Sequence, residues 1–343
     1  MKRRTFFKTS AMVGAGLMTS GLSFGKTSRN PVQAGRRVGI IGLDTSHATA
    51  FTKALNAEDA SPGFGGYKIV AAYPQGSKDI QSSVRRVPGY IEEVKKYGVE
   101  IVDTIPDLLK KVDVVLLESN DGRPHLEQVI PVLKARKTVF IDKPIAGSLT
   151  DAIAIFQAAK DYNVPVFSSS ALRYQTNIDD IMKNKSIGKV LGATTFSTCI
   201  IEPTHPDLFW YGIHGVEPLY AVMGTGCQTL SRVHTPDTDV VIGIWNENRV
   251  GTFHGLRAGK TDFGGHVFGE KGITTFGDYK GYDPLLKEII KFFQTGISPV
   301  ASEETIEIFT FMEAADESKR RSGASVSLTE VKQKALAEVK KTW

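Results

Sequence analysis

Histidine is the commonest metal ligand in proteins, and this sequence of 343 residues contains seven histidines. No two of them form an H-x-H or H-E-x-x-H pair, the spacings that bring two imidazoles onto one face of a strand or a helix. A metal site would therefore have to be assembled from distant parts of the chain, and we predict that there is none. The histidines are His47, His125, His205, His214, His234, His254 and His266.

A polar turn follows the apolar run Val38 to Leu43, where dinucleotide-binding proteins carry G-x-G-x-x-G. The sequence here is Gly42-Leu43-Asp44-Thr45-Ser46-His47, so only the first glycine is present. The second glycine normally lets the backbone approach a pyrophosphate, and a carboxylate from Asp44 in its place would repel the phosphates. Asp44, Thr45 or Ser46 could instead cap the following helix, whose free amides would still attract an anion. The turn weakens the case for a dinucleotide without removing it.

The segment after the second apolar run reads Tyr73-Pro74-Gln75-Gly76-Ser77-Lys78. Rossmann proteins that select NAD usually carry Asp or Glu here, on the ribose hydroxyls, and this segment has neither. Ser77 and Lys78 could receive the 2′-phosphate of NADP instead. They could equally form only a turn, and the sequence leaves both alternatives open.

Helix-length segments separate six apolar, β-rich runs between residues 38 and 167. This alternation predicts βαβ units and a mostly parallel, Rossmann-like sheet. Val112 to Leu117 is apolar on both faces, as expected of a central strand between two layers of helices. Because ligands of such sheets bind at the carboxyl ends of the strands, the residues after each run are the candidates for chemistry. The runs are Val38 to Leu43, Lys68 to Tyr73, Val99 to Val102, Val112 to Leu117, Thr138 to Ile141 and Val164 to Phe167.

Two segments at this edge of the sheet carry a family resemblance. Glu118 to Gln128 contains Asn120 and His125, and Ile141 to Ala146 contains Asp142-Lys143-Pro144. They resemble the Gfo/Idh/MocA superfamily of glucose-fructose oxidoreductase and inositol dehydrogenase, whose members show Asn and His at the first place and Glu-Lys-Pro at the second. The resemblance runs in order over residues 36 to 328 and includes Gly212 to Glu217, Val267 to Gly272 and the helix Ser302 to Arg321.

The resemblance implies hydride transfer between a carbohydrate or polyol carbon and NAD or NADP, tightly bound if present. It places Lys143 where cofactor and substrate meet, with Asp142 in place of the commoner glutamate. A buried lysine there can orient a substrate hydroxyl and, with its pKa lowered, relay its proton. A surface lysine is the weaker alternative, because Lys143 directly follows an apolar strand. The candidate cofactor residues are Gly42, Asp44, Thr45, Ser46, His47, Ser77, Ser119, Asn120, His125, Asp142 and Lys143.

His214 aligns with the family's catalytic histidine, and an imidazole titrates in the range that a general base needs. A histidine packed within a helix is the alternative. The aspartate that family dehydrogenases often carry four residues earlier is Trp210 here, so the proton relay lacks its carboxylate. Trp210 and Tyr211 could form an aromatic platform for a sugar ring, or belong to the core. The candidate substrate contacts are Arg173, Trp210, Tyr211 and His214, with Lys143 and His214 as the catalytic pair.

From about Gly188 the pattern changes to strands with tight turns, which predicts a large, mainly antiparallel sheet in an α/β domain. The family resemblance implies that this sheet covers the cleft and contributes to a homo-oligomer. We expect a targeting segment at residues 1–30, a Rossmann-like domain at 36–170, a substrate and oligomerisation domain at 171–328 and a terminal helix at 329–343. The predicted strands are Lys189 to Ser197, Thr229 to His234, Val240 to Trp245, Val250 to Leu256 and a hairpin within Gly264 to Phe276.

The amino terminus has the pattern of a signal. It begins Lys2-Arg3-Arg4-Thr5-Phe6-Phe7-Lys8, and a weakly apolar stretch from Ala11 to Leu22 follows that is too short to span a membrane. The paired arginines resemble the twin-arginine type, which exports folded proteins to the periplasm and leaves no stable membrane anchor after processing. A disordered basic tail is the alternative.

Charge and cysteine content exclude several classes of protein. The net charge is +5, but residues 1–30 contain six basic and no acidic residues, and the remainder carries 36 basic against 37 acidic side chains. The body therefore lacks the basic surface that nucleic-acid binding needs. Cys199 and Cys227 are expected to be buried apolar residues, although an oxidising compartment would allow a disulfide.

Three functions compete. The favoured one is a nicotinamide-dependent oxidoreductase acting on a carbohydrate or polyol. The second is a lyase, hydratase or hydrolase on the same fold, and the third is a non-catalytic exported binding protein, because a fold does not determine a reaction. The missing glycines, ribose acid and relay aspartate favour the alternatives, whereas Asn120, His125, Lys143 and His214 favour the oxidoreductase.

Overall fold

The computed structural model describes residues 35–183 and 187–342. The predicted targeting segment, residues 1–30, lies outside these residues and stays a prediction. No helix in the described residues is long and apolar enough to cross a membrane.

The first sheet has six parallel strands in the order β3-β2-β1-β4-β5-β6. All six predicted apolar runs contribute a strand, which confirms the Rossmann-like sheet. β4 is completely buried, as its two apolar faces require. The strands are β1 (Arg37–Ile41), β2 (Lys68–Tyr73), β3 (Glu100–Ile101), β4 (Val114–Leu117), β5 (Val139–Ile141) and β6 (Val166–Phe167).

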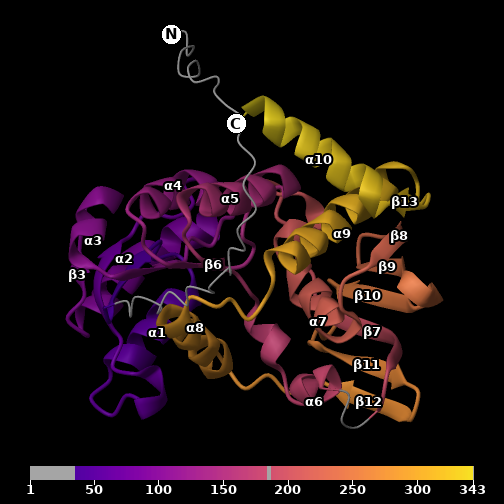
Figure 1. Cartoon of the computed structure of the whole chain (residues 1–343), viewed down its shortest axis with the longest axis horizontal. Coiled ribbons are helices and arrows are strands. Elements are labelled where there is room, and N and C mark those ends of the chain that lie inside the picture. Colours follow the sequence, from indigo (N-terminus) through magenta and orange to yellow (C-terminus); the bar gives the residue numbers. More distant parts are fainter. Residues whose placement is uncertain (1–34, 184–186, 343) are drawn as a thin grey trace, which may run out of the picture. The chain divides into compact units, whose positions relative to one another are not determined.

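Helices cover both faces of this sheet, with α4 and α5 on one side and α1 on the other (Figure 1). Alternate residues of each strand enter different apolar clusters: Ile40 packs on the side of α1, and Ile41 on the side of α4 and α5. The helices are α1 (Ser46–Asn56), α2 (Gln81–Lys95), α3 (Ile105–Lys111), α4 (His125–Lys134) and α5 (Leu149–Tyr162).

Helix α8 (Asp283–Thr295) returns to the first sheet from the carboxyl-terminal half of the chain. Its buried face joins the apolar cluster on the α1 side, and the rings of Phe292 and Phe167 lie 5.5 Å apart. The apolar spacing of this segment predicts a helix but not the sheet on which it packs. This return also places the residues just before α8 near the amino-terminal end of α1.

The second sheet has seven strands in the order β12-β11-β7-β10-β9-β8-β13. Only β7 and β10 pair in parallel, which confirms the mainly antiparallel sheet. The strands are β7 (Val190–Thr198), β8 (Cys227–His234), β9 (Thr238–Trp245), β10 (Val250–Leu256), β11 (Gly264–Gly269), β12 (Gly272–Phe276) and β13 (Val326–Ser327).

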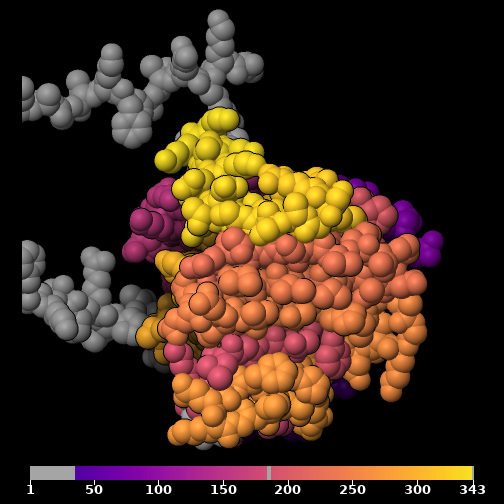
Figure 2. Space-filling model, turned by 90° about the vertical axis from the view of Figure 1, so that its right-hand side faces the viewer, coloured from indigo at the N-terminus to yellow at the C-terminus, as the bar shows by residue number. Residues whose placement is uncertain are grey.

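One face of this sheet packs against helices, and the other is open. The inner face contributes Val241, Trp245 and Phe253 to a cluster with α7 and α9. The opposite face is seen from outside in Figure 2, where residues 227–276 form a broad orange surface. Both cysteines are buried and free. The remaining helices are α6 (Ile178–Met182), α7 (Ile213–Met223), α9 (Ser302–Arg320) and α10 (Leu328–Thr342).

Candidate active site

A cavity of about 560 Å³ lies at the carboxyl edge of the first sheet. Loops and helices attached to both sheets line it, because the start of α7 and the loop after β7 face the ends of β4 and β5. Two charge-bearing side chains of opposite sign, Arg86 and Glu202, stand on its walls among several aromatic rings. The predicted residues that line it are Thr45, Ser46, His47, Asn120, Lys143, Trp210, Tyr211 and His214.

Lys143 follows β5 directly and is almost fully buried. Its Nζ lies 3.6 Å from Oδ2 of Asp142. Burial alone would lower the pKa of this amine, but the charge of Asp142, with smaller contributions from Tyr211 and Tyr282, raises it above its usual value. The expectation of a lowered pKa is therefore wrong, because the neighbouring carboxylate stabilises the ammonium. Lys143 can donate hydrogen bonds to a substrate oxygen, but it is no base.

His214 is the second residue of α7, and its ring borders the cavity. Burial, with Lys143 and His47 nearby, holds the pKa of His214 well below its usual value, so the imidazole is neutral at neutral pH. Its Nδ1 lies 2.9 Å from the hydroxyl of Ser170. Glu217, one turn further along α7, accepts a 2.8 Å hydrogen bond from the amide of Ser170. Ser170 and Glu217 thus fix the orientation of the His214 ring on the side away from the cavity.

The aromatic residues expected at the substrate site lie at the cavity, and their contact with a substrate stays a prediction. Trp210 and Tyr211 both line the cavity, and their ring centroids are 6.4 Å apart. The Tyr211 ring meets His214 edge-on at 5.3 Å. Arg173, in contrast, does not line the cavity: it is buried, with its guanidinium 2.5 Å from Glu304 and 3.8 Å from Glu217. The substrate role predicted for Arg173 is wrong, because those carboxylates hold its charge within the protein.

Asp44 does not sit where its charge would repel a phosphate. It is fully buried, and its carboxylate accepts hydrogen bonds from the backbone amides of Ser77 and Asn120, each at 2.9 Å. The side chain thus joins the loops that follow β1, β2 and β4. Gly42 has a φ of 91°, and a Cβ there would come within 2.5 Å of the Ser119 amide nitrogen, so this first glycine of the fingerprint is required by close packing.

Three predicted cofactor residues lie behind the cavity wall and not on it. Ser77 donates to a carboxylate oxygen of Asp121 at 3.0 Å, and Ser119 donates to Gln128 at 2.8 Å. His125 is fully buried, with its ring nitrogens 3.1 and 2.7 Å from the carbonyl oxygens of Ile145 and Ser119. These side chains hold the loops of the sheet edge together. Their direct contact with a cofactor stays a prediction.

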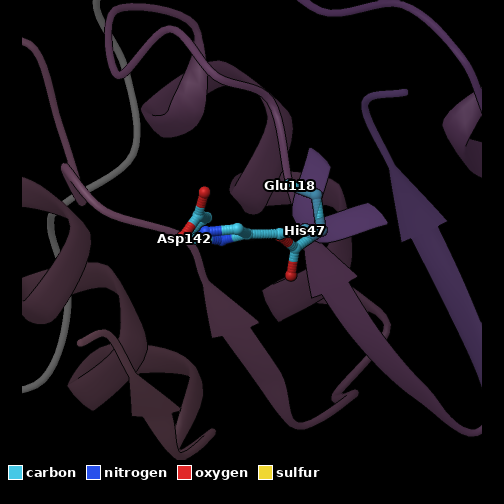
Figure 3. A group of neighbouring side chains, drawn as sticks. All are labelled: His47, Glu118 and Asp142. Carbon is cyan, nitrogen blue, oxygen red and sulfur yellow. Dashed lines mark hydrogen bonds and ion pairs between the residues drawn. The ribbon is translucent and has the colours of Figure 1, made fainter. Parts of the chain in front are cut away.

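His47 stands where the third glycine of the fingerprint would be, and it begins a cluster with Glu118 and Asp142 (Figure 3). Its Nδ1 lies 2.9 Å from Oδ1 of Asp142 and 3.9 Å from Oε2 of Glu118. Glu118 is fully buried, and its carboxyl oxygens have no hydrogen-bond partner in the described residues. Burial and the charge of Asp142 raise the pKa of Glu118 well above its usual value.

Comparison with known proteins places the first part of the chain. Residues 36–170 match the model of the Gfo/Idh/MocA oxidoreductase family with its NAD-binding Rossmann fold. The match covers less than half of the chain, and it agrees with the resemblance that Asn120, His125 and Lys143 indicate. No curated protein matches the chain.

Solved structures share the fold of most of the chain. A probable dehydrogenase from Thermotoga maritima has a TM-score of 0.69 at 21% identity, covering 86% of this chain and 99% of its own. The myo-inositol 2-dehydrogenase of Lactobacillus plantarum gives 0.70 at 17% identity, with coverages of 85% and 98%. The scyllo-inositol dehydrogenase of Lactobacillus casei, with NAD(H) and scyllo-inositol bound, gives 0.68 at 14%, with coverages of 85% and 99%. At these identities the likeness concerns the fold alone.

The residues at the start of α1 are suited to bind the pyrophosphate of a dinucleotide. Thr45, Ser46 and His47 at the start of α1 line the cavity, no acidic residue stands in the first turn, and no side chain caps the helix. The capping role proposed for Asp44, Thr45 or Ser46 is therefore not observed. Arg86 adds a positive charge to the same cavity wall.

Eleven lining residues were not predicted, and the polar ones among them include Arg86, Glu202, Tyr279 and Tyr282. The hydroxyl of Tyr282 lies 3.1 Å from that of Ser46, and its ring meets His47 at 4.4 Å. Its separation of 236 residues from Ser46 explains why no local pattern could reveal it. Arg86 could have been predicted, because it is a basic residue in α2, the helix that follows the segment Tyr73 to Lys78.

Proposed function

We propose that this protein is an NAD(P)-dependent oxidoreductase that acts on a carbohydrate or polyol. The observation that carries the proposal is that Lys143, His214 and the uncapped start of α1 line one cavity. A hydrogen-bond donor, a neutral imidazole and an anion site are the groups that oxidation of a carbinol by a nicotinamide cofactor needs. That the inositol dehydrogenases share the fold supports the substrate class.

The residues have separate tasks. The amides at the start of α1, Asn120 and Arg86 would hold a nicotinamide cofactor, which would supply the hydride acceptor. The Lys143 ammonium donates a hydrogen bond to the substrate hydroxyl and fixes its position. The neutral His214 takes the hydroxyl proton as the carbon gives up its hydride. Trp210 and Tyr211 provide apolar ring faces that suit the C–H faces of a sugar.

Mass spectrometry of natively purified, then denatured protein tests the cofactor. Released NAD or NADP is the expected result, and calorimetric titration of cofactor-free protein should give saturable heat with one of them. If none is released and millimolar NAD and NADP give no heat, the oxidoreductase proposal fails. We expect tight binding, because an exported enzyme would receive its cofactor before crossing the membrane.

A second candidate is non-redox chemistry, lyase, hydratase or hydrolase, on the same class of substrate. The observation that favours it is Trp210 in place of the relay aspartate: His214 has a serine hydroxyl and no carboxylate as partner in the described residues. Absorbance of reduced cofactor at 340 nm during turnover separates the two. If a sugar substrate is consumed while the absorbance at 340 nm does not change, the cofactor is not reduced in net terms. This result would favour the second candidate or a cofactor that is regenerated in each cycle.

We also propose that the open face of the second sheet forms a homo-oligomer. Ile244, Val250, Phe268 and Ile273 lie in one register row across four strands, with Gly192 of β7 between them, and are 38–70% exposed. An exposed apolar row of this length is typical of a subunit contact. Light scattering should show an oligomer that Phe268→Asp dissociates. Ile297→Asp, at an exposed apolar position outside the sheet, is the control.

Export through the twin-arginine route is the last part of the proposal, and Arg3 and Arg4 support it. Replacing both by lysine should leave the protein in the cytoplasm of a bacterial host, measured by cell fractionation. Unchanged export would show that another route is used.

A further inference from the structure

Glu118 is buried without a hydrogen bond among the described residues, although Nδ1 of His47 lies 3.9 Å from its Oε2. It follows β4 directly, has no exposed surface, and neither of its oxygens has a hydrogen-bond partner in the described part of the chain. Buried carboxyl groups in proteins are normally paired, hydrogen-bonded or bound to a metal. Its position at the ligand-binding edge of the sheet makes an undetected partner the simplest explanation.

Two further ligand groups converge on the same point. His47 comes from the start of α1 and Asp142 from the end of β5, so the three side chains belong to three segments that the sheet brings together (Figure 3). One ligand atom of each lies within 4.8 Å of the other two. The two distances from Nδ1 of His47, 2.9 Å to Asp142 and 3.9 Å to Glu118, bracket the separation of about 3.0–3.4 Å between neighbouring ligands that bonds near 2.1 Å impose.

We propose that His47, Glu118 and Asp142 bind one divalent transition-metal ion, with Zn²⁺ as the ion that matches them best. One imidazole nitrogen with two carboxylate oxygens is a borderline donor set, suited to zinc and less to the all-oxygen sites of Mg²⁺ or Ca²⁺. Three protein ligands leave a coordination position open. This reverses the sequence-based prediction of no metal, which rested on the absence of local histidine pairs.

The charges around the site are compatible with such an ion. Oδ1 of Asp142 faces His47, whereas Oδ2 lies 3.6 Å from the ammonium of Lys143, so the lysine and the ion would use different oxygens. A divalent cation would offset the charges of both carboxyl groups when they bind it as carboxylates. Entry is through the cavity, since His47 belongs to its wall. The proposal stands whether or not the enzyme transfers hydride.

Zinc uptake by the full-length chain without a histidine tag tests the site. After dialysis against a chelator, the parent protein should bind about one Zn²⁺ per chain by calorimetry and elemental analysis, with a rise in Tm of the order of 5 °C at saturating zinc. Mg²⁺ at the same concentration should give neither. Residues 1–34 contain no His, Cys, Asp or Glu, so this segment offers none of the usual side-chain ligands.

The decisive variant is Glu118→Gln, which keeps the shape and removes the charged ligand. We expect zinc affinity to fall by about 100-fold or more, since changes even in the outer shell of a site cost 10–100-fold. Glu202→Gln, the same substitution on the cavity wall outside the cluster, should bind zinc as the parent does. Equal affinity of Glu118→Gln and the parent, or no zinc bound by the parent, overturns the proposal.

Location of the ion provides a test that needs no variant. Anomalous diffraction at the zinc edge from crystals of the parent protein should place one peak between His47, Glu118 and Asp142. A peak only at other residues would show that the uptake has a different cause and would refute the site, even if Glu118→Gln failed to fold.

Discussion

Two buried clusters of charged side chains differ in how their charges are balanced. Around Arg232 of β8, the guanidinium lies 2.5–2.8 Å from three carboxylates, and Arg257 and Lys319 add further cations. At the cavity, Glu118 has no partner at hydrogen-bond distance among the described residues. The paired charges around Arg232 hold the second sheet to its helices. Glu118, in contrast, lies next to His47, which lines the cavity, and has no hydrogen bond in the described part of the chain. The three carboxylates of the first cluster, which we name the Arg232 cluster, are Asp207, Asp239 and Asp316.

The largest expected effect is on stability, from Arg232→Met. Methionine fills much of the volume but leaves three carboxylates without their shared cation, and breaking a buried ion pair in this way costs about 3–5 kcal/mol. Urea unfolding at neutral pH measures the loss. Arg320→Met is the matched control, because Arg320 pairs with Glu317 on the surface and such pairs contribute at most about 1 kcal/mol. Similar values for both variants would show that the Arg232 cluster is not structural.

The next effect is on turnover, from Lys143→Met and His214→Ala. Each should reduce kcat on an identified substrate by about a hundredfold or more, because each removes a group that acts on the reacting hydroxyl. The unfolding midpoint is measured for each variant, because Lys143→Met also leaves the buried Asp142 carboxylate without its neighbouring ammonium. Lys53→Met, an exposed lysine of α1, should leave turnover unchanged. Full activity of both cavity variants would contradict the catalytic assignment, while the fold would stand.

The same contrast explains what could be predicted from the sequence. Apolar runs such as Val112 to Leu117 predict buried strands because burial of both faces follows from local composition. Lys143 could be placed because it directly follows such a strand. The pKa of Lys143 could not, because it depends on the orientation of Asp142 and on two tyrosines from distant segments.

Side chains whose role depends on distant partners escaped prediction. Asp44 was judged from its charge beside a phosphate, but amides after β2 and β4 bind its carboxylate inside the protein. His47 occupies a glycine position of the fingerprint, and nothing local indicates that it reaches Asp142, 95 residues away. The sequence predicts that Arg173 contacts the substrate, whereas in the fold it pairs with Glu217 and Glu304.

A smaller effect concerns the pH dependence of the free energy of unfolding through Glu217. This carboxyl group has fewer charged partners than two of the three carboxylates around Arg232 but, unlike Glu118, it accepts hydrogen bonds. Burial raises its pKa to about 7 despite Arg173 and the hydrogen bonds from Ser169 and Ser170. A carboxyl with a raised folded pKa favours the folded state below its unfolded pKa, near 4.5, and this contribution is lost as the pH rises to about 7. Glu217→Gln does not titrate, so relative to the parent it should gain about 1–3 kcal/mol between pH 4.5 and pH 8.

Urea unfolding of both proteins across this range measures the difference. Glu303→Gln, at an exposed position on α9, is the control and should show no such gain. A relative loss of stability with rising pH would mean that Arg173 keeps Glu217 ionised, and Glu217 would then belong with the balanced charges of the Arg232 cluster.

The smallest expected effect is the sharpest test of the comparison: Glu118→Gln in chelator-treated protein. Because Glu118 has no hydrogen bond to lose in the described residues, and the amide needs no desolvation of a charge, the free energy of unfolding should stay within about 1 kcal/mol of the parent or rise. The equivalent change in the balanced cluster, Asp239→Asn, leaves Arg232 and Arg257 facing a neutral group and should cost at least about 2 kcal/mol more. Urea unfolding in the same buffer compares the two directly. If Glu118→Gln is as destabilising as Asp239→Asn, then Glu118 has a structural partner in the metal-free protein. Glu118 would then resemble the paired carboxylates around Arg232, and the contrast between the two clusters would be wrong.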